Sequence, residues 1–211
     1  TYYEGENEQA EAMLQVFFDM AVQVMKKMGH TRSEAETIAE QALAFDRALA
    51  PHVKSAEESA DYSLMYNPRD IKDVLAYSDQ FDFQKALDGI VSLPVEKVIV
   101  TEPAYFEAFH EFVSEDYLPL MKSWMYIQTI LAYTKYLTED LRQMGGTYSG
   151  YLSGIDEAAS QQKAAYHLAL NAFSQVVGLF YGKTYFGETA KEDVKHMVST
   201  MVDVYKNRLS H

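Results

Sequence analysis

His110 and Glu111 open the sequence H-E-x-x-H, but Ser114 stands where the second histidine would be. In zinc peptidases both histidines of this motif bind the metal from one helix face, and the glutamate is the general base for the metal-bound water. One imidazole ligand is therefore missing. At helical spacing the neighbouring aromatic residues gather on one face, with Glu107 and Glu111 roughly opposite. We interpret His110 as a half-exposed histidine on a solvated helix face.

A second arrangement with metal-binding spacing is E-x-x-H, which carboxylate-bridged di-iron bundles use. Glu107 with His110 has this spacing, and Asp193 with His196 echoes it. The ligands of such bundles must point inward, whereas His196 projects away from the apolar stripe of the final predicted helix. We predict that this stripe is buried and consists of Val194, Met197, Val198, Met201, Tyr205 and Leu209. A buried di-metal bundle is thus an alternative that the geometry disfavours.

Glu57 and Asp61 have the E-x-x-x-D spacing that supplies a third zinc ligand and its carboxylate partner in some peptidases. Such pairs are common by chance and carry little weight alone. Motifs for a serine or cysteine nucleophile, a glycine-rich phosphate loop, a dinucleotide site and an EF-hand are all absent from the sequence. We therefore predict that this chain contains no catalytic, cofactor-binding or metal-binding residue.

The elements that would position these residues are mostly helical. Apolar residues recur every three or four positions from Glu8 to Met28, with Asn7 available as N-cap and Gly29 as C-cap. Thr31 and Glu34 then have the spacing of a capping box, which begins a second helix. These two segments predict a helical hairpin.

The middle of the chain predicts shorter elements. Asn67-Pro68 marks a helix start with proline at its first position, and a β-branched run between two prolines is the only credible strand. The partner of that strand cannot be located from the sequence. The predicted elements are helices over Arg69 to Tyr77 and Phe83 to Val91, a strand over Val95 to Val100, and a helix that begins at Pro103.

The second half of the sequence predicts long helices separated by glycine-rich loops. They run from Pro119 to about Met144, from about Asp156 to Tyr181 and from about Thr189 to Leu209. The fold class is therefore predominantly all-α, with about seven or eight helices and at most a minor β element. We expect residues 1–211 to form a single helical domain.

Composition excludes several functions. Lys and Arg number 18 against 31 Asp and Glu, so the formal charge is −13 and binding to nucleic acid or to anionic membrane surfaces is disfavoured. No stretch is long and apolar enough for a membrane span. There is no cysteine, which fits a reducing compartment such as the bacterial cytoplasm, and leaves a bacterial cell surface or secretion open. The start at Thr1 suggests a piece of a longer protein.

One stretch resembles a known family. "GLFYGKTYFGETAKEDVKHMV", residues 178–198, is similar to a segment of the neprilysin and endothelin-converting-enzyme family of zinc metalloendopeptidases, which includes the bacterial endopeptidase O type. The matching positions are Gly178, Phe180-Tyr181, Tyr185-Phe186 and Lys191. Four further stretches resemble the family in the same order: "YYEG", "DYSLMYNPRDI", "VIVTEPAYFEAF" and "LPLMKSWMYIQTI".

The resemblance implies a fragment of the helical N-terminal lobe, which in the family is not catalytic. It implies that zinc and its H-E-x-x-H ligands belong to a catalytic lobe of the same polypeptide, outside this chain, and that His110 has no zinc role. It also implies peptide substrates for the longer protein, with this lobe capping the cleft and limiting substrate size. The alternative is a stand-alone all-α interaction or regulatory domain. The absence of cysteine favours a bacterial type of relative.

Overall fold

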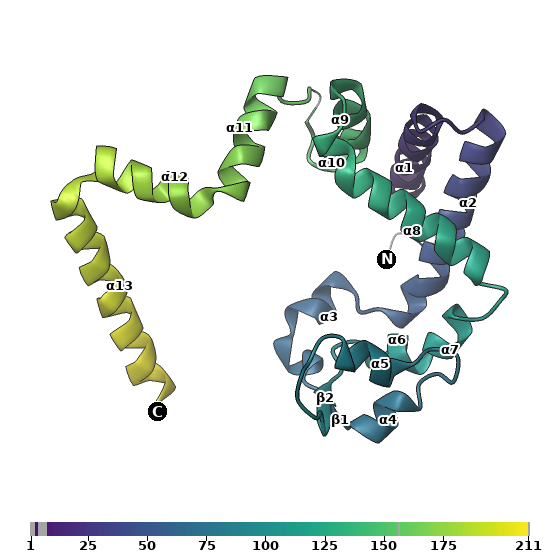
Figure 1. Ribbon diagram of the computed structural model, residues 1–211, viewed down its shortest axis with the longest axis horizontal. Coiled ribbons are helices and arrows are strands. Elements are labelled where there is room, and N and C mark those ends of the chain that lie inside the picture. The colour runs from purple at the N-terminus through teal and green to yellow at the C-terminus, as the bar shows by residue number, and fades with distance from the viewer. Residues whose placement is uncertain (1–2, 4–7, 156, 211) are drawn as a thin grey trace. The chain divides into compact units, whose positions relative to one another are not determined.

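The computed structural model describes residue 3 and residues 8–155 and 157–210 (Figure 1). The chain divides into two compact units between Ala158 and Ala159, and each unit is considered by itself. The predicted all-α class is confirmed. The described residues contain thirteen α-helices and one two-stranded sheet, more helices than the seven or eight expected, because several predicted long helices are interrupted.

The first unit is built on the predicted helical hairpin, α1 (Glu8–Lys27) and α2 (Arg32–Leu49), which packs against α8 (Leu118–Tyr133). Gly29 has a φ of 101°, a left-handed conformation that suits glycine and lets the chain reverse after α1. Thr31 and Glu34 form the predicted capping box at the start of α2. Both local predictions are confirmed, whereas Asn7 lies outside the described residues.

Two apolar clusters hold the helices of the first unit together. The larger cluster joins α1, α2 and α8 through eight buried residues: Ala21, Val22, Val24, Met25, Ala35, Ala39, Ala42 and Ile127. The second cluster joins α2 to the segment after Pro103 through Phe45, Ala108 and Phe112. The half-buried Trp124 packs against both clusters, so it connects the two parts of the core.

The prediction of one continuous helix from Pro119 to about Met144 is wrong. This stretch is divided into α8, the short 3₁₀ segment η3 (Thr134–Tyr136) and α9 (Glu139–Gly145), and α10 (Thr147–Leu152) follows directly. Leu137 leaves the helical conformation, and α9 then packs back against η3. A Cβ at Gly145 would lie 2.2 Å from Oγ1 of Thr134, so this fold-back depends on the missing side chain.

Short elements occupy the region between α2 and α8. They are η1 (Ala50–His52), α3 (Ala56–Ala60), η2 (Tyr62–Met65), β1 (Pro68–Asp70), α4 (Ile71–Leu75), α5 (Phe83–Asp88), β2 (Lys97–Ile99), α6 (Pro103–Glu107) and α7 (Phe109–Phe112). The predicted strand and the helix start at Pro103 are therefore present.

The helix start predicted at Pro68 is wrong, because Pro68 begins the strand β1 instead. Strand β1 is the missing partner of β2: the two pair antiparallel, with Pro68 opposite Ile99. Proline is tolerated at the first residue of a strand and disfavours helical backbone in the residue before it. Asn67 in turn accepts a hydrogen bond from the backbone of Val100 at 2.9 Å. The helix α4 begins three residues later, at Ile71.

The second unit consists of α11 (Gln161–Ala172), α12 (Ser174–Tyr181), the π-helical turn η4 (Gly182–Phe186) and α13 (Gly187–Leu209). The start predicted at about Asp156 lies outside the described residues, and the predicted helix that continues to Tyr181 is interrupted at Phe173. None of the described residues of this unit is buried, and the α13 stripe from Val194 to Leu209 is exposed. The prediction that this stripe is buried is therefore wrong for this chain. No helix within the described residues is long and apolar enough to cross a membrane.

Candidate functional site

His110 lies on the exposed side of α7. Its Nδ1 is placed to donate a hydrogen bond to the carbonyl oxygen of Glu107 at 3.1 Å. Ser114 donates to the carbonyl of Glu111 at 2.7 Å, and Glu111 itself is exposed. The neighbouring Phe112, 2% exposed, belongs to the second core cluster. The side chains of His110 and Ser114 are therefore bonded to carbonyls of their own helical turns, and those of His110 and Glu111 face solvent.

The two E-x-x-H pairs lie in different units of the chain. Asp193 and His196 are exposed, as are the apolar residues on the other side of α13. Within the part of the chain that the structure describes, no three His, Cys, Asp or Glu side chains are grouped to hold a metal ion. The described residues therefore do not fit a zinc centre. That the chain has no catalytic, cofactor-binding or metal-binding residue stays a prediction.

Glu57 lies in the first turn of the short helix α3, Asp61 follows its last residue, and both are exposed. Oδ1 of Asp61 accepts hydrogen bonds from the hydroxyl and the backbone N–H of Ser63, at 2.7 and 2.9 Å. These two bonds lower the pKa of Asp61 because they stabilise its ionised form. The carboxylate thus caps η2, which accounts for its position without a metal.

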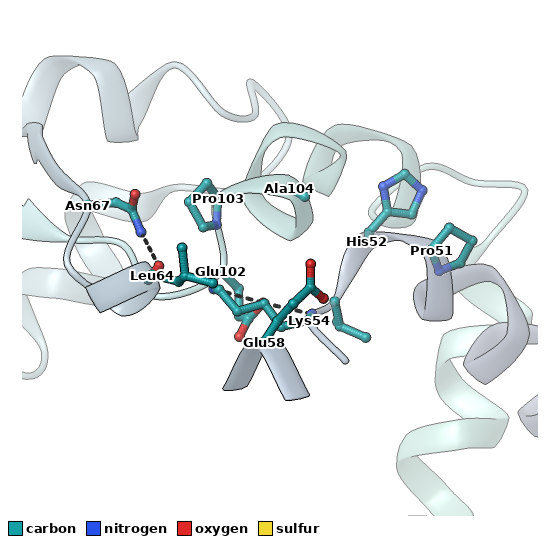
Figure 2. Close-up of a pocket in the computed structure, with 10 residues that line it drawn as sticks. Pro51, His52, Lys54, Glu58, Leu64, Asn67, Glu102, Pro103 and Ala104 are labelled. Carbon is teal, nitrogen blue, oxygen red and sulfur yellow. Dashed lines mark hydrogen bonds and ion pairs between the residues drawn. The ribbon is translucent and has the colours of Figure 1, made fainter. Parts of the chain in front are cut away.

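The first unit contains a pocket of about 370 Å³ beside α3 and the start of α6 (Figure 2). It is lined by Pro51, His52, Val53, Lys54, Glu58, Leu64, Asn67, Glu102, Pro103 and Ala104. These residues come from two separate segments of the sequence, residues 51–67 and residues 102–104. No local spacing relates the two segments, so the sequence analysis did not identify the pocket.

The charged groups of this pocket are already paired. Nζ of Lys54 lies 3.4 Å from Oε2 of Glu102 and donates to the carbonyl of Thr101, while the Lys54 backbone N–H donates to Glu102 at 3.2 Å. Glu58 accepts a hydrogen bond from the backbone of Ser55 at 2.8 Å, and this capping bond lowers its pKa. The lining contains no hydroxyl or thiol beside a base, so nothing in it matches a nucleophilic site.

His52 at the edge of the pocket is also committed to packing. Its ring meets the ring of Phe112 edge to face, with centroids 5.5 Å apart. This contact orients the imidazole against the second core cluster. The pocket is therefore a hydrogen-bonded cleft that can admit a small group, and its titratable residues serve the fold.

A smaller hollow of about 180 Å³ lies around Asp46 on α2. The carboxylate accepts hydrogen bonds from the hydroxyl of Tyr3 at 2.7 Å and from the indole N–H of Trp124 at 3.4 Å. Arg47 lies over the Tyr3 ring, 5.2 Å from its centroid. Burial, followed by the bond to Asp46, raises the pKa of Tyr3 well above its usual value. This cluster ties Tyr3 to α2 and α8.

Comparisons with known proteins give one consistent result. A model of the family described as peptidase family M13 matches residues 1–211. A neutral endopeptidase of Lactococcus lactis is 38% identical over 210 residues, which is 100% of this chain and 33% of that protein. A putative zinc metalloproteinase of Streptococcus gordonii is 30% identical over 210 residues, 100% of this chain and 37% of that protein.

A solved structure agrees with the sequence relatives. The crystal structure of PEPO from Lactobacillus rhamnosis superposes with a TM-score of 0.79 at 28% identity, covering 99% of this chain and 33% of that one. The chain thus spans about a third of the length of the relatives that it matches.

Proposed function

The chain belongs to peptidase family M13, and from this we propose that it forms the non-catalytic part of a zinc endopeptidase that hydrolyses short peptides. In this proposal the chain caps the active-site cleft of the longer protein, called the parent protein below. The cap would admit short peptides and exclude folded proteins. The observation that carries the proposal is the match over the full chain to about a third of the neutral endopeptidases.

The residues that each part of the parent protein contains indicate which part binds zinc. A peptidase zinc needs three protein ligands and a general base beside its water. The described residues of this chain group no such set, and His110 is engaged with the Glu107 carbonyl. We therefore assign the zinc ligands and the base to the remaining two thirds of the parent protein. The parent's catalytic lobe is then the chain's principal partner.

Two substrates that differ in size and folding test the proposal. The parent protein is expected to cleave a short unstructured peptide and to leave the same sequence intact inside a loop of a folded protein. The 211-residue chain alone is expected to cleave neither substrate and to bind no stoichiometric zinc.

Removing these 211 residues from the parent protein tests whether they limit substrate size. The isolated 211-residue chain tests whether the catalytic groups lie elsewhere. A parent variant without these 211 residues, if it folds and keeps its zinc, should lose the discrimination between the peptide and the folded substrate. Proteolysis by the isolated chain would contradict the assignment of the catalytic groups. Equal cleavage of both substrates by the intact parent would contradict size limitation.

A further inference from the structure

The helix α12 is apolar around more than half of its circumference. At 100° per residue its apolar side chains spread over an arc of about 200°; they are Val176, Val177, Leu179, Phe180 and Tyr181. Leu179 is 61% exposed and Phe180 is 62% exposed. No residue of α12 carries a charge. A helix of this composition is typical of a protein interior, where it is covered from several sides.

The neighbouring helix α13 has a narrower apolar face. The exposed stripe defined above, from Val194 to Leu209, follows the three- and four-residue spacing of one helix side. His196, Ser199 and Asp203 occupy the opposite side. Helix α13 is therefore built to be covered along one side and to keep the other in water.

The apolar surfaces of the second unit have no cover within that unit. No described residue of the unit is buried, although its helices α11, α12 and α13 are joined only by Phe173 and by η4 (Figure 1). Soluble monomers rarely leave apolar patches of this extent in water. Something must cover α12 and the α13 stripe in the working protein.

We propose that the remaining part of the same polypeptide surrounds α12 and packs along the α13 stripe. This inference rests on the proposed function, which places the chain in a protein about three times as long. A body of that size can enclose a helix, whereas two-fold pairing with a second copy covers one face of it. The enclosing surface must itself be apolar, because a charge buried against α12 would have no partner there.

Cysteine labelling locates the covered face, since the chain has no native cysteine. Val176→Cys reports on α12, Met197→Cys on the α13 stripe, and Ser199→Cys is the matched control on the polar side of α13. A maleimide reacts with each introduced cysteine, and peptide mass spectrometry measures the rate at that position. In the parent protein we expect Val176→Cys and Met197→Cys to react at least tenfold more slowly than in the 211-residue chain. Ser199→Cys should react equally in both.

Three other labelling results would overturn the inference. Equal rates for Met197→Cys in the parent and in the chain would show that the stripe is uncovered in both. Protection already present in the 211-residue chain would show that the chain covers itself. Protection of the parent that disappears on dilution, together with dimer dissociation in light scattering, would identify a second copy as the cover.

Two additional measurements keep the test independent of variant folding and of the proposed function. Hydrogen exchange at the amides of α12 needs no substitution, and it should be slower in the unmodified parent than in the chain. Peptide hydrolysis by the parent is measured in parallel. An active parent with an accessible Met197→Cys defeats the docking inference alone, whereas an inactive parent with protected cysteines defeats the proposed function alone.

Discussion

At the scale of single residues, Asp46 links parts of the first unit that are distant in the sequence. Its two carboxylate oxygens accept from the Tyr3 hydroxyl at 2.7 Å and from the Trp124 indole at 3.4 Å. Trp124 also contacts both apolar clusters. Removing the carboxylate would leave two partly buried donors without their acceptor, and such donors are costly.

We expect Asp46→Ala to lower the free energy of unfolding of the 211-residue chain by about 1–3 kcal/mol. Denaturant titration followed by tryptophan fluorescence measures the change, because Trp124 is the chain's single tryptophan. The control is Asp19→Ala, which removes an exposed carboxylate bonded to Gln15 on the same helix and should change stability by less than about 0.5 kcal/mol. Equal effects of the two substitutions would contradict the linking role.

A second residue-scale contact joins the end of α1 to the start of α9. Nζ of Lys27 lies 2.7 Å from Oδ2 of Asp140, and this bond is the main reason why the pKa of Asp140 is lowered to about 2. Because the folded-state pKa is the lower one, the stabilisation is present above the ordinary value of 3.8 and is lost as the pH falls towards about 2.

Lys27→Met should therefore raise the pKa of Asp140 towards its ordinary value. It should also reduce the loss of stability that the chain shows on acidification below 3.8. Carboxyl-detected NMR titration of Asp140 measures the first effect, and denaturant titration at several pH values measures the second. Lys26→Met, one residue earlier in the same turn of α1, is the control and should leave the Asp140 titration unchanged. An unaltered pKa in Lys27→Met would refute the assigned cause.

At the scale of elements, the break between α8 and α9 depends on a close approach of two segments. Thr134 is 4% exposed and donates to the carbonyl of Leu131 at 2.9 Å, and the Cα of Gly145 faces its side chain. A Cβ at position 145 would lie 2.2–2.7 Å from three atoms of Thr134. The packing of α9 against η3 therefore requires glycine at position 145, because a larger side chain would clash with Thr134.

We expect Gly145→Ala to destabilise the first unit by about 1–3 kcal/mol, as overpacking of a close contact does. Thermal and denaturant unfolding measure the change. Gly89→Ala at the end of α5 is the matched control, because its Cβ would meet backbone oxygens at ordinary distances of 3.4 and 3.6 Å with φ at −73°. A neutral Gly145→Ala would indicate that α9 can move away from Thr134.

At the scale of the whole molecule, the two units differ in how they are stabilised. The first unit has two apolar clusters with fully buried residues such as Met25 and Ile127. The second has no buried residue in its described part. Burial of apolar side chains is the main source of tertiary stability, so the helices of the second unit depend on local hydrogen bonding in this chain.

Hydrogen exchange of the 211-residue chain should reveal this difference. Amides of α1 and α2 should exchange by global unfolding of the first unit, whereas those of α12 and α13 should exchange through frequent local opening. We expect protection factors in the second unit to be lower by a factor of at least about 100, which corresponds to roughly 3 kcal/mol less opening free energy. Mass spectrometry of peptic fragments measures both sets in one sample. Equal protection would mean that the second unit is covered in the chain itself.

Local signals in the sequence were sufficient for much of the fold. The hairpin of α1 and α2 follows from apolar periodicity, from Gly29 and from the Thr31–Glu34 capping box, all of which act within a few residues. The β-branched run that forms β2 and the start of α6 at Pro103 are equally local. The five family-like stretches also identified the family that the chain belongs to.

Tertiary contacts decided what local signals could not. The partner of β2 begins at Pro68, about thirty residues earlier, and only the antiparallel pairing distinguishes that strand from a helix start. The pocket beside Lys54 joins two segments with no common spacing, and the break before α9 depends on Gly145 meeting Thr134. Periodicity revealed the apolar stripe of α13 but not what covers it. Hydrogen bonds within a helix form between residues that are close in the sequence. Burial of a helix face depends instead on packing against segments that are distant in the sequence.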